Sequence, residues 1–183
     1  MFTEERGQLL VRLARAAIAR EFGIATPSLA HPDWLDAPGA VFVTLTESGR
    51  LRGCIGSLEA HRPLGMDVEH NARAAAFSDP RFPPLRPEEL DRVRVEVSLL
   101  SPAVPMQFKD ESDALAQLRP GVDGVILEYG RYRATFLPQV WEQLPQPDVF
   151  MAHLKQKAGL SGDFWQQALR LSRYGVDKFK ETD

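Results

Sequence analysis

Hydrophobic and polar positions recur with two different periods along the chain, and these periods predict its elements. Between Thr3 and Gly23 apolar residues recur at helical spacing, which predicts a helix with Thr3 as N-cap and Gly23 as its stop. A second helical pattern covers residues 63–79, and Pro80 ends it by disfavouring helix at the preceding residue. The proline-containing residues 24–38 between them predict a surface loop. Both helices are expected to cover a core with one face.

A β-hairpin is predicted between these two helices. Residues 41–56 contain a run of strand formers, then a turn, then a second short extended run. If Ser48 and Gly49 form a two-residue turn, Cys54 pairs with Val43. That register would place the thiol on a partly apolar face of the hairpin.

The second half of the chain predicts further strands and two helices. Apolar and polar residues alternate over residues 93–99, which is typical of a half-buried strand. A short helix is expected over residues 112–118, and a longer one capped by Asp148 and ending at Gly159. Residues 169–174 are predicted to form the last strand.

A second hairpin is predicted around a two-residue turn at Gly130 and Arg131. Glycine at the first turn position favours type II′. This register sets Glu128 opposite Arg133 as a cross-strand ion pair. The same register places six residues on one face of the hairpin: Val125, Leu127, Tyr129, Tyr132, Ala134 and Phe136.

The order of these elements predicts an α+β fold. Helices and strands do not alternate in a βαβ rhythm, and the two best strand pairs are hairpins, so antiparallel or mixed sheets with flanking helices are expected. Prolines within residues 80–87 and 102–105 mark candidate lobe boundaries, but neither segment has the length or polarity of a flexible linker. We therefore predict one domain over residues 1–183 with two lobes.

Composition narrows the class of protein. The 183 residues are 44% hydrophobic and 26% charged, as in ordinary globular domains, and the net charge of −3 gives no general attraction for nucleic acid. A single cysteine excludes an internal disulfide and suits a reducing compartment. Neither an export signal nor an apolar stretch of the roughly 20 residues that span a membrane is visible. A cytoplasmic location is expected.

The candidate chemistry centres on Cys54. On a regular strand Arg52, Cys54 and Gly56 share one face, so Arg52 would favour a reactive thiolate. Glycine inside a strand often marks close approach of a ligand or another backbone, which adds Gly53 to the candidates. In the alternative reading, Cys54 is a small buried hydrophobe.

Other polar residues are weaker candidates. His70 or Glu96 would carry a proton to or from Cys54, and the polar face that includes Glu96 is either a cleft wall or a solvated face. Asp79 and Arg81 flank Pro80 and form either a ligand contact or a structural ion pair. The four histidines lack metal-ligand spacing, and no phosphate-binding loop is present, so no metal site is expected and the cofactor stays undefined.

Five blocks of the sequence carry a resemblance to a known family. The blocks are LRGCIG at 51–56, the run 70–85, VEVSLLSP at 95–102, GVIL at 124–127 and the run 134–145. They resemble, in order, the motifs of the AMMECR-domain family, called in microbes the AmmeMemoRadiSam system protein A group. The resemblance implies a two-lobed α+β fold with a cleft, and a setting beside a Memo-like protein and a radical SAM enzyme. It implies no established catalytic residue.

Three functions remain open from the sequence. We favour a ligand-binding or accessory component that acts with the Memo-like protein and the radical SAM enzyme. The alternative is an enzyme or sulfur-handling protein with Cys54 as nucleophile and Arg52 as its electrostatic partner. RNA or nucleotide binding is weaker and requires Arg52, Arg81, Arg94 and Arg133 to converge. The candidate ligand contacts are Arg52, Gly53, Cys54, Gly56, Asp79, Arg81 and Glu96.

Overall fold

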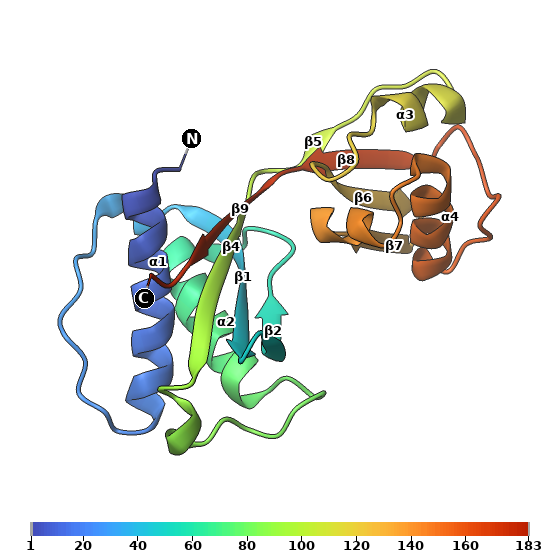
Figure 1. Ribbon diagram of the computed structural model, residues 1–183. Helices are drawn as coiled ribbons and strands as arrows, with labels where there is room; N and C mark the ends of the chain where they lie inside the picture. The colour runs from blue at the N-terminus through green and yellow to red at the C-terminus, as the bar shows by residue number, and fades with distance from the viewer. Residues whose placement is uncertain (1, 183) are drawn as a thin grey trace. The chain divides into compact units, whose positions relative to one another are not determined.

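A computed structural model describes residues 2–182 and confirms the α+β class (Figure 1). Its α-helices flank two sheets in which the strands run antiparallel. The described chain divides into two compact units. The first contains residues 2–100 and 177–182, and the second contains residues 101–176.

The first unit is a five-stranded sheet with two helices. Its strand order is β2-β1-β4-β9, and the short β3 pairs with β1. Two single-turn 3-10 helices, η1 and η2, lie in its connections. The elements are α1 (Glu4–Glu21), η1 (Asp33–Leu35), β1 (Pro38–Glu47), β2 (Arg50–Gly56), β3 (Arg62–Pro63), α2 (Leu64–Phe77), η2 (Pro87–Glu89), β4 (Val93–Leu100) and β9 (Val176–Lys180).

Both helices pack on the same face of this sheet (Figure 1). The N-cap of α1 is Thr3, as predicted, and its side chain accepts a hydrogen bond from the Arg6 N–H. The predicted alternation of β4 is also confirmed, because Val93, Val95 and Val97 are buried in this core. The opposite face of the sheet carries the intervening polar side chains.

The first hairpin departs from the predicted register. The two-residue turn forms, with both turn residues at positive φ, but Arg52 is an extra residue on β2. Such a β-bulge shifts the pairing by one position. Cys54 therefore pairs with Thr44 and not with Val43, so its side chain leaves the core face for the opposite face of the sheet.

The second unit is a four-stranded sheet in the order β5-β8-β6-β7. The hairpin of β6 and β7 has the predicted register, and Gly130 has the positive φ that a type II′ turn requires. The predicted ion pair forms, with Arg133 Nε 3.1 Å from Glu128 Oε1. The elements are β5 (Val104–Pro105), α3 (Glu111–Gln117), β6 (Gly124–Tyr129), β7 (Tyr132–Phe136), η3 (Pro138–Glu142), α4 (Pro147–Ala158) and β8 (Arg170–Tyr174).

Two predictions about the C-terminal part were wrong. Asp148 does not cap α4, because Pro147 takes the first helical position and Gln146 is the N-cap. The strand predicted at residues 169–174 is β8, but it is not the last strand, since β9 follows it. The predicted helix end is confirmed by Gly159, which has a φ of 95°.

Candidate functional site around Cys54

The bulge at Arg52 turns this side chain into the interior. Its guanidinium donates to Glu89 from Nε at 2.9 Å and from Nη2 at 3.2 Å, and both side chains are about one tenth exposed. The hydrogen bonds from Arg52 lower the pKa of the Glu89 carboxyl. Arg52 therefore fastens β2 to the η2 segment and does not lie beside the thiol of Cys54.

The two glycines of the motif are explained by close packing within the chain. A Cβ on Gly53 would lie 2.1 Å from the backbone oxygen of Ala75 in α2. A Cβ on Gly56 would lie 2.2 Å from the ring of Phe42. Glycine at these positions lets a helix and a ring approach the strand, so the space beside each glycine is filled by this protein's own atoms.

Cys54 is half-buried on the face of the sheet opposite the helices. Its backbone N–H donates to Asp79 Oδ2 at 2.9 Å. Its Sγ lies 3.3 Å from the Thr44 hydroxyl on the neighbouring strand. The backbone of Cys54 is thus held in place by Asp79, and its thiol contacts a neutral hydroxyl.

Asp79 and Arg81 form a clamp on the backbone of Cys54. The Asp79 carboxylate is buried and accepts from Arg81 Nε at 3.0 Å and Nη2 at 2.8 Å. Arg81 Nη2 also donates to the Cys54 carbonyl oxygen at 3.3 Å. The hydrogen bonds from Arg81 hold the pKa of the Asp79 carboxyl well below its usual range. The predicted ion pair between Asp79 and Arg81 is therefore formed, and it holds the segment that follows α2 against β2.

Glu96 and His70 are not brought to the thiol. Thr44 stands between Cys54 and Glu96 in the sheet, and the Glu96 carboxylate lies 3.5 Å from Lys180 Nζ. Glu96 is two strands away from Cys54, about 10 Å at the usual strand spacing. His70 is exposed on α2, which packs on the other face of the sheet.

Sequence reasoning missed Glu89 and Thr44. Thr44 follows directly from the register, so the unrecognised bulge hid it. Glu89 had a local signal, because it also accepts from the Arg86 N–H at 2.8 Å, three residues earlier, in a capping arrangement. Its long-range role as the partner of Arg52 had no sequence signal.

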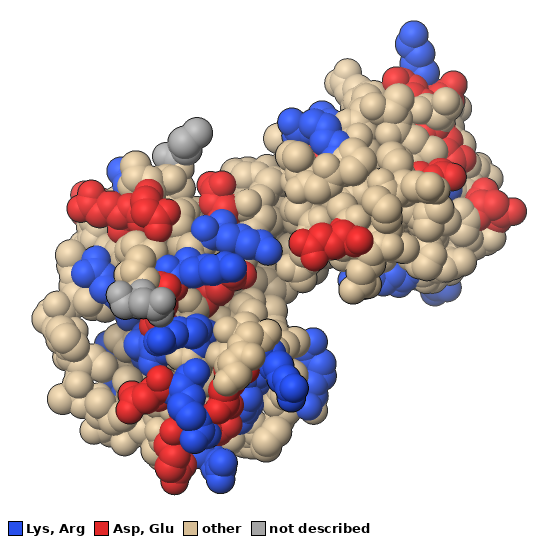
Figure 2. All heavy atoms as spheres, viewed as in Figure 1, with Lys and Arg blue, Asp and Glu red and all other residues tan. Residues whose placement is uncertain are grey.

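The arginines proposed for nucleic-acid binding do not form a set of free cations. Arg52, Arg81 and Arg133 are each paired with a carboxylate. Figure 2 shows Lys and Arg interspersed with Asp and Glu on the drawn face of the first unit. This arrangement gives no support to the RNA-binding alternative.

Among residues 2–182, no group of three or more His, Cys, Asp and Glu side chains is arranged to hold a metal ion. Among the helices of the same range, none combines the length and apolar character needed to cross a membrane.

Comparison with known proteins places the chain in a family. The AMMECR1 family model matches residues 11–179. This chain belongs to the AMMECR1 family. Similar relatives include an archaeal protein of Methanothermobacter thermautotrophicus, 39% identical with 98% of this chain and 96% of the relative covered. Protein MJ0810 of Methanocaldococcus jannaschii is 36% identical, with 100% of this chain and 94% of the relative covered.

The fold of this AMMECR1 chain also matches a solved structure. The uncharacterized protein PH0010 from Pyrococcus horikoshii superposes with a TM-score of 0.84 at 34% identity. The match covers 98% of this chain and 93% of that protein. The family and the fold are thereby shown. The names of these relatives state no reaction and no ligand.

Proposed function

We propose that this AMMECR1-family chain is a ligand-binding or accessory protein, and that it recognises its partner through the helix-free face of the first sheet around Cys54. In the setting that the sequence resemblance implies, it acts with a Memo-like protein and a radical SAM enzyme. The observation that carries the proposal is the half-buried Cys54 on this face, with its backbone clamped by Asp79 and Arg81.

The chemistry of this face suits recognition of a polar ligand. Cys54 and Thr44 lie in one row with Glu96, and Phe42 and Ser98 pair in the next row. The row thus offers a thiol, a hydroxyl and a carboxylate on a rigid sheet, which positions side chains more closely than a loop does. Neither helix of the unit lies over this face.

The same geometry favours binding over catalysis. A catalytic thiol needs a base or a cation that promotes its ionised form. The Cys54 thiol contacts the Thr44 hydroxyl, which is not a base near neutral pH. Arg52, the residue expected to play that part, is committed to Glu89.

Protection of Cys54 from alkylation tests the proposal. Because the chain has one cysteine, iodoacetamide labelling reports on this site alone. We expect labelling to slow when the purified Memo-like or radical SAM protein from the same genome is added. The matched control is His70→Cys in a Cys54→Ser background, which places the thiol on the helix side of the same unit and is expected to label at an unchanged rate. Equal slowing at both positions, or none at Cys54, would contradict the proposal.

The enzyme alternative retains one supporting observation. The Arg81 guanidinium lies 3.3 Å from the Cys54 carbonyl oxygen, so a cation is close to the half-buried thiol. If native Cys54 labels much faster than the same thiol in the urea-unfolded chain at equal pH, an activated thiolate is present. That outcome would favour a nucleophilic Cys54 over the accessory role.

A further inference from the structure

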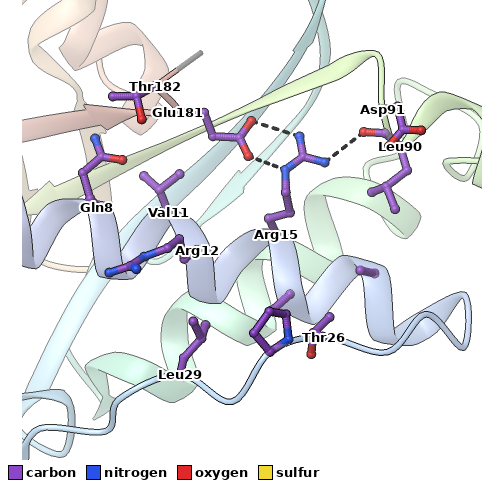
Figure 3. A pocket seen from close by; sticks show the side chains of 13 residues that line it. Gln8, Val11, Arg12, Arg15, Thr26, Leu29, Leu90, Asp91, Glu181 and Thr182 are labelled. Atoms are coloured by element: carbon purple, nitrogen blue, oxygen red, sulfur yellow. Dashed lines mark hydrogen bonds and ion pairs between the residues drawn. The ribbon is translucent and has the colours of Figure 1, made fainter.

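A separate cavity lies in the first unit, along the side of α1 that the loop after it covers (Figure 3). Its volume is about 670 Å³, within the range of small-molecule sites. One stripe of α1 forms its floor, from Gln8 to Ala19. At the helical rise this stripe is about 16 Å long. Thr26 and Leu29 of the loop, Leu90 and Asp91, and the chain end at Glu181 and Thr182 form the walls.

The body of the cavity is apolar. Val11, Ala16 and Ala19 contribute the α1 side, and Leu29 and Leu90 face it from other segments. Such walls favour a ligand with a hydrocarbon or aromatic body, since each buried methylene contributes about 0.8 kcal/mol. The three alanine and valine side chains on α1 are small, which leaves this volume open.

The central charges of the cavity are already neutralised. Arg15 pairs with Glu181 through Nε and through Nη2, the latter at 2.9 Å. Its Nη1 donates to the carbonyl oxygen of Leu90 at 2.9 Å, and Nη2 also donates to the carbonyl oxygen of Val93 at 2.6 Å. Glu181 also accepts from the Val95 N–H at 2.9 Å. This pair therefore builds the wall and presents little net charge to a ligand.

Arg12 is the cation available to a ligand. It lies on the same α1 stripe, one turn from Gln8 and close to Arg15 in sequence. Within residues 2–182 the structure shows no hydrogen bond or ion pair to its side chain. Gln8 is different, because its amide donates to Glu4 and to the Lys180 carbonyl oxygen, both at 2.8 Å. Figure 3 shows Arg12 extending toward the Gln8 end of the stripe, whereas Asp91 lies at the other end.

We propose that this cavity binds an amphipathic organic acid, with its carboxylate on Arg12 and its apolar body along α1 beneath the loop. Arg12 gives the site a cationic end, and Asp91 disfavours the reverse orientation. A guanidinium and a carboxylate form charge-assisted hydrogen bonds, which fix the position of the anionic group. The site is distinct from the Cys54 face, and it does not depend on the function proposed for that face.

The test uses 1-anilinonaphthalene-8-sulfonate, whose fluorescence rises in apolar sites, with decanoate, decanol and decylammonium as competitors. For the native chain we expect one saturable site from which decanoate displaces the dye better than decanol does, and decylammonium least. Arg12→Gln is expected to weaken decanoate binding about threefold to tenfold, which corresponds to a single partly exposed charged contact. Decanol competition should stay unchanged in that variant.

Matched variants locate the site. Arg20→Gln removes a cation of the same helix that does not line the cavity and should leave decanoate binding unchanged. Ala16→Phe should abolish binding by filling the cavity, and Thr26→Phe provides the same test from the loop without altering α1 packing. Circular dichroism verifies the fold of each variant. Undiminished binding in a folded filler variant, equal effects of Arg12→Gln and Arg20→Gln, or preference for decylammonium would each overturn the proposal.

Discussion

The two units of this protein pack different kinds of side chain against their sheets. The interior of the first unit is mainly aliphatic and includes buried polar groups such as Arg52, Asp67, Asp79 and Glu89. The interior of the second unit has fewer buried polar groups, such as Asp123 and Lys155, and contains the stacked rings of Trp141 and Phe150 at a centroid distance of 3.7 Å. The drawn face of the second unit also shows fewer charged side chains than that of the first (Figure 2).

This difference indicates which interactions select a single packing arrangement in each unit. Aliphatic side chains pack in several ways, so directional hydrogen bonds can select one arrangement. Asp67 in α2 is an example, since it is fully buried and accepts from the Val41 N–H at 2.9 Å and the Ser57 hydroxyl at 2.7 Å. In the second unit the large rings themselves restrict the packing, because stacked and edge-on contacts have preferred geometries.

The largest expected effect is the loss of a ring from the second unit. Trp141→Ala removes the stacking on Phe150 and the hydrogen bond from Nε1 to the Asp123 carbonyl oxygen at 2.7 Å. We expect a loss of about 3–5 kcal/mol in the free energy of unfolding, measured by urea denaturation. Amide exchange should rise most within residues 101–176. Trp165→Ala, at a partly exposed ring, is the matched control, and an equal loss there would contradict the role assigned to the stack.

A smaller loss is expected from a single added methyl group in the first unit. Gly53→Ala forces a Cβ against the Ala75 backbone oxygen and separates α2 from β2. The expected cost is about 1–3 kcal/mol, measured by thermal and urea unfolding. Gly65→Ala is the control, because its Cβ would meet Leu35 at an ordinary 3.4 Å inside a helix. If both variants were equally stable, the close approach at Gly53 would not be required.

The Asp79–Arg81 and Glu89–Arg52 pairs give the first unit a predictable response to acid. Folding lowers the pKa of Asp79 and of Glu89 through their arginine partners. Their contribution to stability is therefore fully present above their ordinary pKa of about 4 and is lost as the pH falls below it.

Asp79→Asn tests this response. We expect a loss of about 1–2 kcal/mol at neutral pH, limited because Arg81 is half-exposed and solvent screens its charge. The difference between urea midpoints at pH 7 and pH 3 should also shrink. The control is Asp177→Asn, an exposed aspartate of the same unit. An unchanged acid response in Asp79→Asn would show that this pair does not control it.

The smallest effect is expected at the cysteine itself. Cys54→Ala removes a half-buried side chain and its contact with the Thr44 hydroxyl but leaves the backbone hydrogen bond to Asp79 available. We expect a loss below about 1 kcal/mol in urea denaturation. A larger loss would mean that the thiol is a core element, and the recognition surface proposed around it would lose its central residue.

Much of the secondary structure could be predicted because its signals are local. The N-cap at Thr3, the alternation of β4 and the whole register of the β6–β7 hairpin follow from nearby residues. In that hairpin the glycine turn, the ring-bearing face and the Glu128–Arg133 pair all favour one register. The motif around Cys54 also pointed to close backbone approach, which the glycines show.

Other features depended on contacts between distant parts of the chain. No local rule placed the bulge at Arg52, since its partner Glu89 lies 37 residues away in the sequence. β9 has little apolar pattern of its own and is defined by pairing with β4. The α1 cavity likewise arises only where the loop, Leu90 and the chain end meet around one helix stripe.

The sequence by itself thus determined the class of fold, most element positions and the family, because periodicity, turn chemistry and motif order are written in neighbouring residues. Only the tertiary structure decided which face of the sheet carries Cys54. It also decided that Arg81, and not Arg52, is the cation near Cys54. The physical reason is that a one-residue bulge reverses the face of a strand, and whether a bulge forms depends on long-range partners. The same dependence left Arg12 as the cation available in the α1 cavity, while Arg15 is neutralised by Glu181.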